Sequence, residues 1–288
     1  MADIKVFGVV GAGQMGRGIA QVAAQSGFDV KLLDASLELA QQGVQRIAKD
    51  LTRQVERGKM GADERDRVVA RITAIADYKD CEDVDFLVEA ATERAELKRA
   101  ILQSADAVMK PGAILASNTS SISLTKLAAQ VKRPTQVIGM HFMNPVPVMK
   151  LVEIVRALQT SDEAYNVTRD IALRMGKTLI TAKDVPGFIV NRMLIPFLNE
   201  ACFALQEGLG TAEDIDKGAK LGLNHPMGPF ELADLIGLDT VLFIAEVLHR
   251  EFGDDKYRPP TILRNYVAAG WLGRKSGRGF YDYSQEKR

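Results

Sequence analysis

Cysteine and histidine are scarce in this 288-residue sequence, and their positions exclude several kinds of site. The only cysteines, Cys81 and Cys202, lie far apart and outside any CxxC or Cys/His ligand spacing. We therefore expect neither a metal site nor a disulfide framework, and a reducing compartment fits this cysteine usage best. Only three histidines are present, so a proton-transferring imidazole has few candidates.

The sequence also lacks an excess of charge of either sign and any long apolar run. Lysine plus arginine and aspartate plus glutamate both total 37, so no global field favours nucleic acid or an anionic membrane surface. Nowhere do about 18 apolar residues follow one another, and the N-terminus does not resemble a secretory signal. We expect a cytoplasmic protein that binds neither nucleic acid nor membrane. Its length suits roughly two domains.

Short apolar runs separated by helical stretches organise the first part of the chain. The runs lie at residues 4–10, 29–33, 84–88, 113–116, 137–140, 151–155 and 178–181. This alternation predicts an α/β fold with a mostly parallel sheet and helices on its faces. The charged segment 37–76, with a break at 58–61, is predicted to form an inserted helical hairpin that protrudes as an arm.

After Asp184 the strand signals stop, and helical spacing continues to about residue 270. We therefore expect an α/β domain over residues 1–184 and an all-α domain over residues 185–288. Thr211, followed by Ala-Glu-Asp, has the pattern of a capping box at the start of a helix. Pro196 is expected to kink the helix that contains it.

A glycine pattern directly follows the first predicted strand. Gly11, Gly13 and Gly16 have the spacing GxGxxG, which allows a tight turn and close approach of the backbone to a pyrophosphate at a helix N-terminus. Asp34, at the end of the next strand, can accept hydrogen bonds from an adenosine ribose and would repel a 2′-phosphate. The context favours a Rossmann-type domain that binds NAD over a glycine-rich surface turn. The nearby Lys31 leaves some tolerance of NADP open.

Polar residues follow other predicted strands at the carboxyl edge of the sheet, where open α/β folds bind ligands. His141 ends one apolar run, and Glu153 lies within the next, where a buried carboxylate needs a partner. The segment Ser117–Ser121 reaches the same edge, and its hydroxyls can cap the next helix or bind a ligand.

Structural explanations exist for each of these residues. His141 could be a satisfied core histidine, and Asn191, a polar residue in the apolar stretch FIVNRM, could make an interhelical hydrogen bond. His249 lies on an amphipathic helix, where a solvated surface position is expected. His225 precedes a proline, which suits a turn or a cap.

Seven segments taken together resemble the 3-hydroxyacyl-CoA dehydrogenase family, especially its bacterial short-chain members. They are GAGQMG, EAATE, SNTSS, HFMNPVPVMKLVEIV, PGFIVNR, HPMGPFELADLIGLD and GWLGRKSGRGFYDY, and they cover essentially the whole chain. The resemblance implies an NAD-dependent oxidoreductase that interconverts (S)-3-hydroxyacyl-CoA and 3-ketoacyl-CoA, with a C4 acyl group as the expected substrate. It also implies a homodimer formed through the C-terminal domain.

The resemblance implies roles for individual residues. His141 and Glu153 match the family's acid–base pair. Ser120 matches the serine that touches substrate and cofactor, and Asn191 matches the asparagine that orients the substrate. Cofactor contacts carried over in the same way, together with the glycine turn, are Gly11, Gly13, Gln14, Met15, Gly16, Asp34, Glu93, Lys98, Ser120, Asn144 and Lys275.

The implied chemistry agrees with the residues. In oxidation a base takes the 3-hydroxyl proton while hydride leaves C3, and in reduction the protonated His141 returns the proton, so no metal is needed. The CoA-binding serine and lysine of the family's arm align poorly with the stretch LTRQVERGKM. Arg53, Arg57 and Lys59 are therefore the candidates for contacts to the CoA phosphates.

Two alternative functions make different demands on the sequence. The 3-hydroxyisobutyrate and 6-phosphogluconate dehydrogenases also combine a GxGxMG turn with a helical domain, but they use a catalytic lysine where this chain has Asn191-Arg192. A lens crystallin recruited from relatives of the family would keep the fold without turnover, whereas the presence of Ser120, His141 and Glu153 favours activity. The acyl-chain range, the physiological direction and the pathway stay open.

Overall fold

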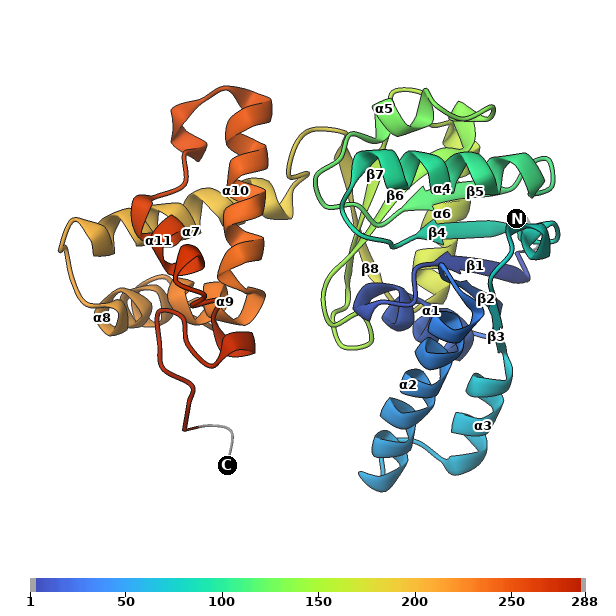
Figure 1. Cartoon of the computed structure of the whole chain (residues 1–288), viewed down its shortest axis with the longest axis horizontal. Helices are drawn as coiled ribbons and strands as arrows, with labels where there is room; N and C mark the ends of the chain where they lie inside the picture. The colour runs from blue at the N-terminus through green and yellow to red at the C-terminus, as the bar shows by residue number, and fades with distance from the viewer. Residues whose placement is uncertain (1–3, 286–288) are drawn as a thin grey trace. The chain divides into compact units, whose positions relative to one another are not determined.

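A computed structural model of the chain describes residues 4–285. They fall into two compact units, the first ending at Val185 and the second beginning at Pro186 (Figure 1). Each unit has its own hydrophobic core. The units are therefore described one at a time.

The first unit is built on an eight-stranded sheet with the order β3-β2-β1-β4-β5-β6-β7-β8. The strands are β1 (Val6–Val10), β2 (Asp29–Leu33), β3 (Ile72–Ile75), β4 (Phe86–Glu89), β5 (Ile114–Ser117), β6 (Val137–Phe142), β7 (Leu151–Arg156) and β8 (Thr178–Lys183). Only β6 and β7 pair antiparallel among these strands, so the predicted mostly parallel sheet is confirmed. The strand order reverses between β1 and β4, and ligands of open α/β sheets bind at such a switch point.

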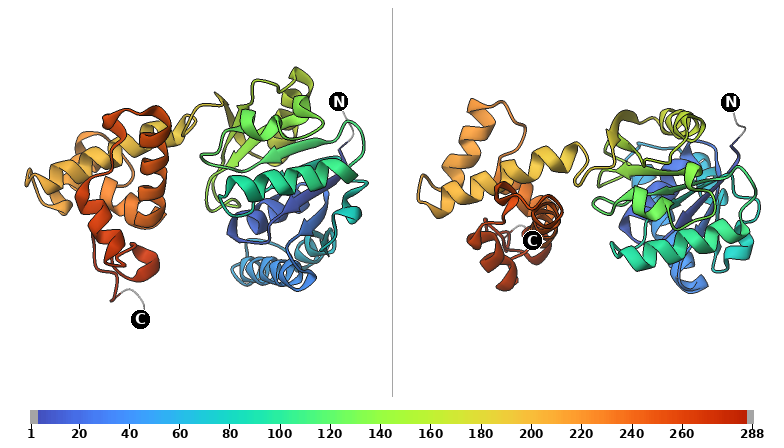
Figure 2. Two further views of the ribbon diagram at one scale, coloured as in Figure 1. Left: turned by 45° about the horizontal axis from the view of Figure 1, so that its top comes forward. Right: turned by 90° about the horizontal axis from the view of Figure 1, so that it is seen from above.

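Helices cover both faces of this sheet, as predicted. They are α1 (Gln14–Gln25), α2 (Leu37–Glu56), α3 (Ala62–Ala70), α4 (Ala95–Val108), α5 (Leu124–Ala128) and α6 (Asp162–Arg174). Figure 2, in the view from above, shows α4 and α6 on opposite sides of the sheet. α2 and α6 begin at serine caps, since the hydroxyls of Ser36 and Ser161 accept hydrogen bonds from backbone N–H groups three residues later.

The predicted arm is correct only in part. α2 and α3 form a helical hairpin that extends away from the sheet (Figure 1), and Gly58 turns the chain between them with a φ of 67°. Residues 72–75, however, form the edge strand β3, so the expectation of helix up to residue 76 was wrong there. Ile72 and Ile75 are buried against the core, and β-branched side chains favour a pleated, half-buried surface.

The second unit is formed by helices. They are α7 (Val190–Gln206), α8 (Ala212–Lys217), α9 (Pro229–Ile236), α10 (Leu238–Phe252) and α11 (Thr261–Ala268). The Thr211 hydroxyl accepts a hydrogen bond from the N–H of Asp214 at 3.1 Å, which is the cap that the sequence predicts for α8. Gly237, with a φ of 102°, divides the apolar stretch into α9 and α10. Pro196 lies inside α7, where the expected kink stays a prediction. Within residues 4–285, none of the helices has both the length and the apolar character needed to cross a membrane.

Candidate active site

The glycine turn between β1 and α1 has the geometry that close approach of a phosphate requires. Gly11 has a φ of 104°, a conformation that favours glycine. A Cβ atom at Gly16 would lie 1.7 Å from the carbonyl oxygen of Gly11, so the turn closes on itself there. A Cβ atom at Gly13, the N-cap of α1, would meet no atom within 4 Å. The helix start is thus open to a ligand, and its N–H groups favour an anion. These residues fit a dinucleotide.

Asp34 follows β2, and backbone N–H groups orient its carboxylate. Oδ2 accepts a hydrogen bond from the N–H of Ala12 at 2.6 Å, and Oδ1 accepts one from the N–H of Ala35 at 2.7 Å. Asp34 and the glycine turn both line a cleft of about 640 Å³. Leu97 and Ile101 of α4 contribute to its apolar wall. The cleft therefore combines an anion-binding turn, a fixed carboxylate and an apolar surface.

A buried ion-pair network lies where β4 and β5 end. Lys98 of α4 is 1% exposed, and its Nζ donates to the two carboxylate oxygens of Glu89 at 2.8 and 3.0 Å. The same ammonium lies 3.2 Å from Glu93. The hydroxyl of Ser117 donates to Glu89 at 2.6 Å. Because a buried charge is tolerated only when it is paired, this network fixes α4 against the ends of both strands.

Glu93 accepts hydrogen bonds from the polar residues that follow β5. Its Oε1 accepts hydrogen bonds from the hydroxyl of Thr119, from the N–H of Ser120 at 2.9 Å and from the N–H of Ser121 at 3.1 Å. Burial raises the pKa of the Glu93 carboxyl, but the Lys98 ammonium and these hydrogen bonds outweigh it, so the pKa lies below its usual value. The carboxylate is therefore charged at neutral pH. Ser120 and Glu93, both predicted site residues, lie together.

The hydroxyls of the segment Ser117–Ser121 do not cap the next helix, α5. Ser123 caps α5, since its hydroxyl accepts a hydrogen bond from the N–H of Lys126 at 3.2 Å. The capping explanation that the sequence offered for Ser117–Ser121 is therefore wrong. Their polar groups serve instead to build the network around Glu89 and Glu93 at the sheet edge.

His141 and Glu153 are opposite neighbours on β6 and β7. The antiparallel register pairs them directly, so their side chains lie on the same face of the sheet. His141 Nδ1 lies 2.8 Å from Glu153 Oε2, and Glu153 is fully buried while His141 is 7% exposed. A carboxylate that accepts a hydrogen bond from Nδ1 orients the ring and stabilises its protonated form. Such a pair can exchange a proton with a bound molecule at Nε2.

Two asparagines tie the loops at this edge together. Asn144, in the loop after β6, accepts a hydrogen bond from the side-chain amide of Gln14 in the glycine turn at 3.0 Å. Asn118 accepts one from the N–H of Phe142 at 2.9 Å, which joins the loop after β5 to the end of β6. The sequence analysis gave Asn118 no role, although it belongs to the SNTSS segment. The glycine turn, the His141–Glu153 pair and the Ser120 loop thus share one edge of the sheet.

The candidate CoA-binding residues lie away from this edge. Arg53, Arg57 and Lys59 are exposed at the far end of α2 and in the turn that follows it. Arg53 pairs with Asp50 at 3.5 Å. Since an α-helix rises 1.5 Å per residue, the length of α2 places them roughly 25 to 30 Å from its start beside β2.

The other predicted residues belong to the second unit. Asn191 lies near the start of α7 and is 8% exposed. Lys275 donates to Asp239 Oδ2 at 2.7 Å. The two remaining histidines have partners of their own: His225 packs against the ring of Phe197, and His249 lies 3.1 Å from a carboxylate oxygen of Asp255.

Several buried charged residues were given no role from the sequence, among them Glu89 and Lys177. Glu89 ends an apolar strand, and the rule that a buried carboxylate needs a partner, which was applied to Glu153, would have identified it as well. Lys177 is 7% exposed, yet lysine is normally a surface residue, so nothing in its sequence context signals burial.

A sheet edge that joins a dinucleotide turn to an imidazole able to exchange a proton is characteristic of nicotinamide-dependent dehydrogenases. Comparison with known families identifies the dehydrogenase family to which this chain belongs. The NAD-binding domain of the 3-hydroxyacyl-CoA dehydrogenases matches residues 6–185, and the C-terminal domain of the same enzymes matches residues 187–283. The chain therefore belongs to the 3-hydroxyacyl-CoA dehydrogenase family, and the predicted family, enzyme class and NAD cofactor are confirmed.

Individual relatives are similar over their whole length. A probable 3-hydroxybutyryl-CoA dehydrogenase of Bacillus subtilis is 51% identical, and the match covers 99% of each chain. A 3-hydroxybutyryl-CoA dehydrogenase of Bradyrhizobium diazoefficiens is 50% identical over 99% of this chain and 98% of its own. The crystal structure of an (S)-3-hydroxybutyryl-CoA dehydrogenase from Ralstonia eutropha superposes with a TM-score of 0.94 at 50% identity, covering 98% of this chain and 99% of that one.

Proposed function

We propose that this enzyme interconverts (S)-3-hydroxybutyryl-CoA and acetoacetyl-CoA, using His141 and Glu153 for proton transfer. The observation that carries the proposal is the buried pair itself, with Nδ1 and Oε2 2.8 Å apart at the sheet edge that also holds the glycine turn. The C4 acyl group is inferred from relatives of about 50% identity that bear this activity in their names.

The glycine turn and Asp34 would hold NAD, which would supply hydride transfer to and from C3 of the substrate. His141 takes the proton of the 3-hydroxyl at Nε2 during oxidation and gives it back to the carbonyl oxygen during reduction. Glu153 accepts the hydrogen bond from Nδ1, fixes the tautomer and stabilises the imidazolium. Ser120 contacts the substrate and the cofactor, and Asn191 orients the substrate, as the family resemblance implies.

Cofactor affinity arises from three groups of residues. Backbone N–H groups of the glycine turn, with Gln14 and Met15, hold the pyrophosphate, and Asp34 accepts hydrogen bonds from the adenosine ribose. Glu93, Asn144 and Lys275 are further cofactor contacts in this proposal. Lys98 acts through Glu93, because its ammonium is buried and already bound to two carboxylates.

In this proposal the enzyme binds the phosphates of the acyl-CoA substrate as well as its reacting end. Arg53, Arg57 and Lys59 form an exposed basic cluster at the arm tip, which suits an anionic group far from the thioester. Binding energy from this remote part of the substrate would affect affinity more than the chemical step.

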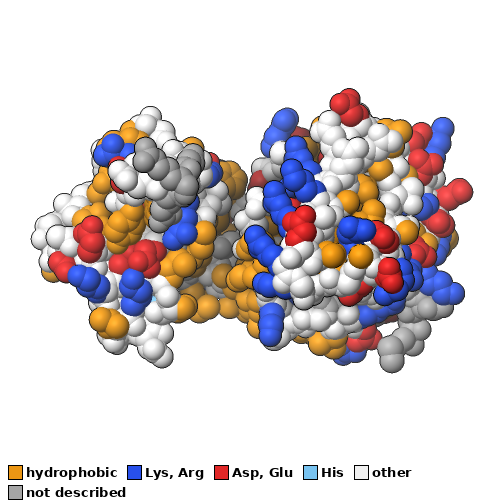
Figure 3. Space-filling model, turned by 90° about the horizontal axis from the view of Figure 1, so that it is seen from below, with side chains coloured by type: hydrophobic (Ala, Val, Ile, Leu, Met, Phe, Trp, Pro, Cys, Tyr) orange, Lys and Arg blue, Asp and Glu red, His pale blue; other side chains and the backbone are white. Residues whose placement is uncertain are grey.

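The second unit also forms a homodimer in this proposal. It exposes several large apolar side chains, and Figure 3 shows hydrophobic side chains gathered on its visible face. The exposed large apolar side chains of the second unit include Met193, Leu209, Leu221, Leu223, Leu235 and Phe243. Extensive exposed apolar surface is typical of an interface. The two cysteines are free and buried, which suits a reducing compartment such as the cytoplasm.

The substrate assignment is tested with 3-ketoacyl-CoA substrates of increasing chain length. NADH oxidation should proceed with the highest kcat/KM for acetoacetyl-CoA and fall as the chain is lengthened toward C16. A maximum at a long chain would refute the C4 assignment, and absence of turnover with every substrate would favour a protein that keeps the fold without activity.

A further inference from the structure

Lys177 is a buried lysine that the proposed chemistry does not use. It follows α6 and immediately precedes β8, and its side chain is almost completely removed from solvent. Burial lowers the pKa of its ammonium. Within residues 4–285, no carboxylate lies within ion-pairing distance of it. Since a buried charge without a counter-charge is costly, its retention calls for a physical reason.

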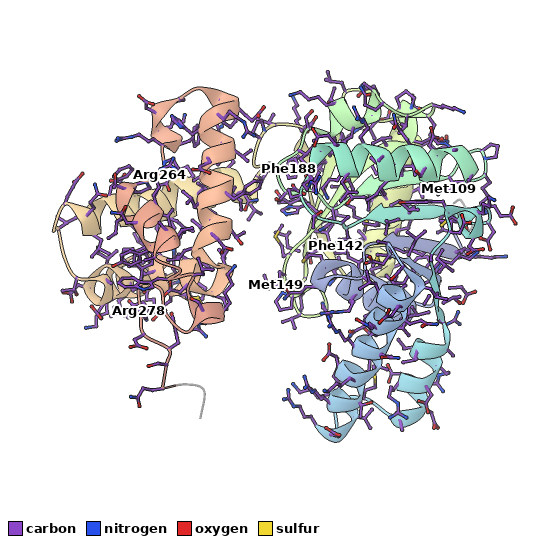
Figure 4. All side chains as sticks on the ribbon, in the orientation of Figure 1. Met109, Phe142, Met149, Phe188, Arg264 and Arg278 are labelled. Atoms are coloured by element: carbon purple, nitrogen blue, oxygen red, sulfur yellow. The ribbon has the colours of Figure 1, made fainter. Side chains whose placement is uncertain are left out.

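The ammonium is satisfied by backbone carbonyls of one loop. Nζ of Lys177 donates to the carbonyl oxygens of Val146 and Met149 at 2.5 and 2.9 Å. Both residues belong to the loop 143–150 that connects β6 to β7, where Met149 is labelled in Figure 4. Two residues of this loop, Pro145 and Pro147, are prolines and therefore have no backbone N–H group to donate to a carbonyl oxygen. A single ammonium with three donors can satisfy both of these carbonyls at once.

The position of Lys177 in the sheet brings it to the ligand-binding edge. β7 runs antiparallel to β6, and β8 runs parallel to β7, so the starts of β7 and β8 lie at the edge where β6 ends. The register pairs Leu151 with Thr178, and the N–H of Thr178 donates to the carbonyl of Lys150 at 2.8 Å. Lys177 therefore holds the loop directly beyond the strand that carries His141.

On its other side the same loop is held by α1. Gln14 of the glycine turn donates to Asn144 at 3.0 Å. Gly18 of α1 packs so closely against Val146 that a Cβ atom there would lie 2.8 Å from the Cβ of Val146. The loop is thus clamped between the dinucleotide-binding helix and the Lys177 ammonium. A shift of the loop at either contact would move Asn144 relative to the glycine turn.

We infer that Lys177 is a positioning residue for the cofactor: by binding the two loop carbonyls it holds Asn144 and Gln14 in the arrangement that NAD requires. The inference rests on the proposed function, because that assigns Asn144 and Gln14 to the cofactor. It explains why a charged side chain occupies this place. An apolar residue would fill the space but would leave the buried carbonyl of Val146 and the partly buried carbonyl of Met149 without this donor.

Lys177→Met tests the inference, because methionine keeps an unbranched, mainly apolar side chain and removes the donors. The dissociation constant of NADH, followed by its fluorescence, should rise by about tenfold, as expected for lost charge-assisted hydrogen bonds. The KM for acetoacetyl-CoA should change by less than about twofold. Lys183→Met is the matched control, since Lys183 lies exposed at the end of β8, the strand that Lys177 precedes, and its replacement should leave NADH affinity unchanged.

A second variant approaches the loop from the other side. Gly18→Ala inserts a methyl group against Val146 and should weaken NADH binding in the same way, even if Lys177→Met does not fold. Normal NADH affinity in folded Lys177→Met, with only a lowered Tm, would show that Lys177 merely stabilises the fold. Normal affinity in Gly18→Ala would equally overturn the inference. If the unmodified enzyme failed to bind NADH, the proposed function itself would fail.

Discussion

Cofactor choice should depend on the single charge of Asp34. Its carboxylate is fixed beside the glycine turn by the N–H groups of Ala12 and Ala35. Lys31 is the nearby cation that could have attracted a 2′-phosphate, but its ammonium already donates hydrogen bonds to Asp83 at 2.6 Å and to the carbonyl of Asp80. The structure therefore predicts that the unmodified enzyme strongly prefers NADH to NADPH.

The size of this preference follows from the charges. Two like charges about 4 Å apart repel by about 4 kcal/mol at an effective dielectric constant of about 20. Because Asp34 is only half-buried, solvent screening reduces this repulsion, and a discrimination of about tenfold to a hundredfold is the reasonable expectation. Removal of the carboxylate should abolish most of it.

The assay compares kcat/KM for NADH and NADPH with acetoacetyl-CoA in two variants. Asp34→Ser removes the charge and makes room, so it should shift the preference toward NADPH. Asp34→Asn keeps an oxygen that can accept the hydrogen bond from Ala12, so it separates loss of charge from disturbance of the turn. Equal use of both cofactors by the unmodified enzyme, or an unchanged ratio in both variants, would refute the role given to Asp34.

Four other predictions concern the arm, the dimer and the buried network, the last with two variants. Replacing the three basic residues of the arm tip by alanine should raise KM for acetoacetyl-CoA more than it lowers kcat, and an N-acetylcysteamine thioester should be unaffected; equal losses with both substrates would move the CoA site elsewhere. Light scattering at micromolar concentration should show a dimer, and a monomer would exclude the proposed interface. Lys98→Met leaves Glu89 buried without its cation, so the free energy of unfolding measured in urea should fall by about 3–5 kcal/mol. A decrease below about 1 kcal/mol would contradict the importance of the Lys98–Glu89 pair. Because the pKa of Glu93 is lowered on folding, its contribution to stability is present above the usual carboxyl value of 4.5 and is lost as the pH falls below it. Tm should therefore fall less steeply with acid in Glu93→Gln than in the unmodified protein, and parallel curves would argue against this assignment.

The features that local sequence pattern controls were predictable. The glycine turn, the strands β1 and β2 and the cap at Thr211 each depend on residues within one short segment. The edge strand β3 was missed because four residues after a charged helix do not show a period that separates strand from helix. Its conformation depends on pairing with β2, which is a tertiary contact.

The site was predictable only where the residue type itself has few alternatives. His141 and Glu153 stood out as polar residues in apolar runs, but their direct pairing depends on the antiparallel register of β6 and β7, which a spacing of twelve residues does not determine. Lys177 could not be found, because its partners are backbone carbonyls that any loop sequence supplies.

The central claim is that His141 and Glu153 transfer the proton as one unit, and the most direct test is a double-mutant cycle on kcat. His141→Ala should lower kcat for acetoacetyl-CoA reduction by about 10²–10⁴-fold while the affinity for NADH barely changes. Glu153→Gln removes the charge beside Nδ1, so the protonated imidazole is less stabilised and kcat should fall. The account predicts that the double variant is little worse than His141→Ala alone. A strictly multiplicative loss would contradict it and would make Glu153 a buried structural carboxylate.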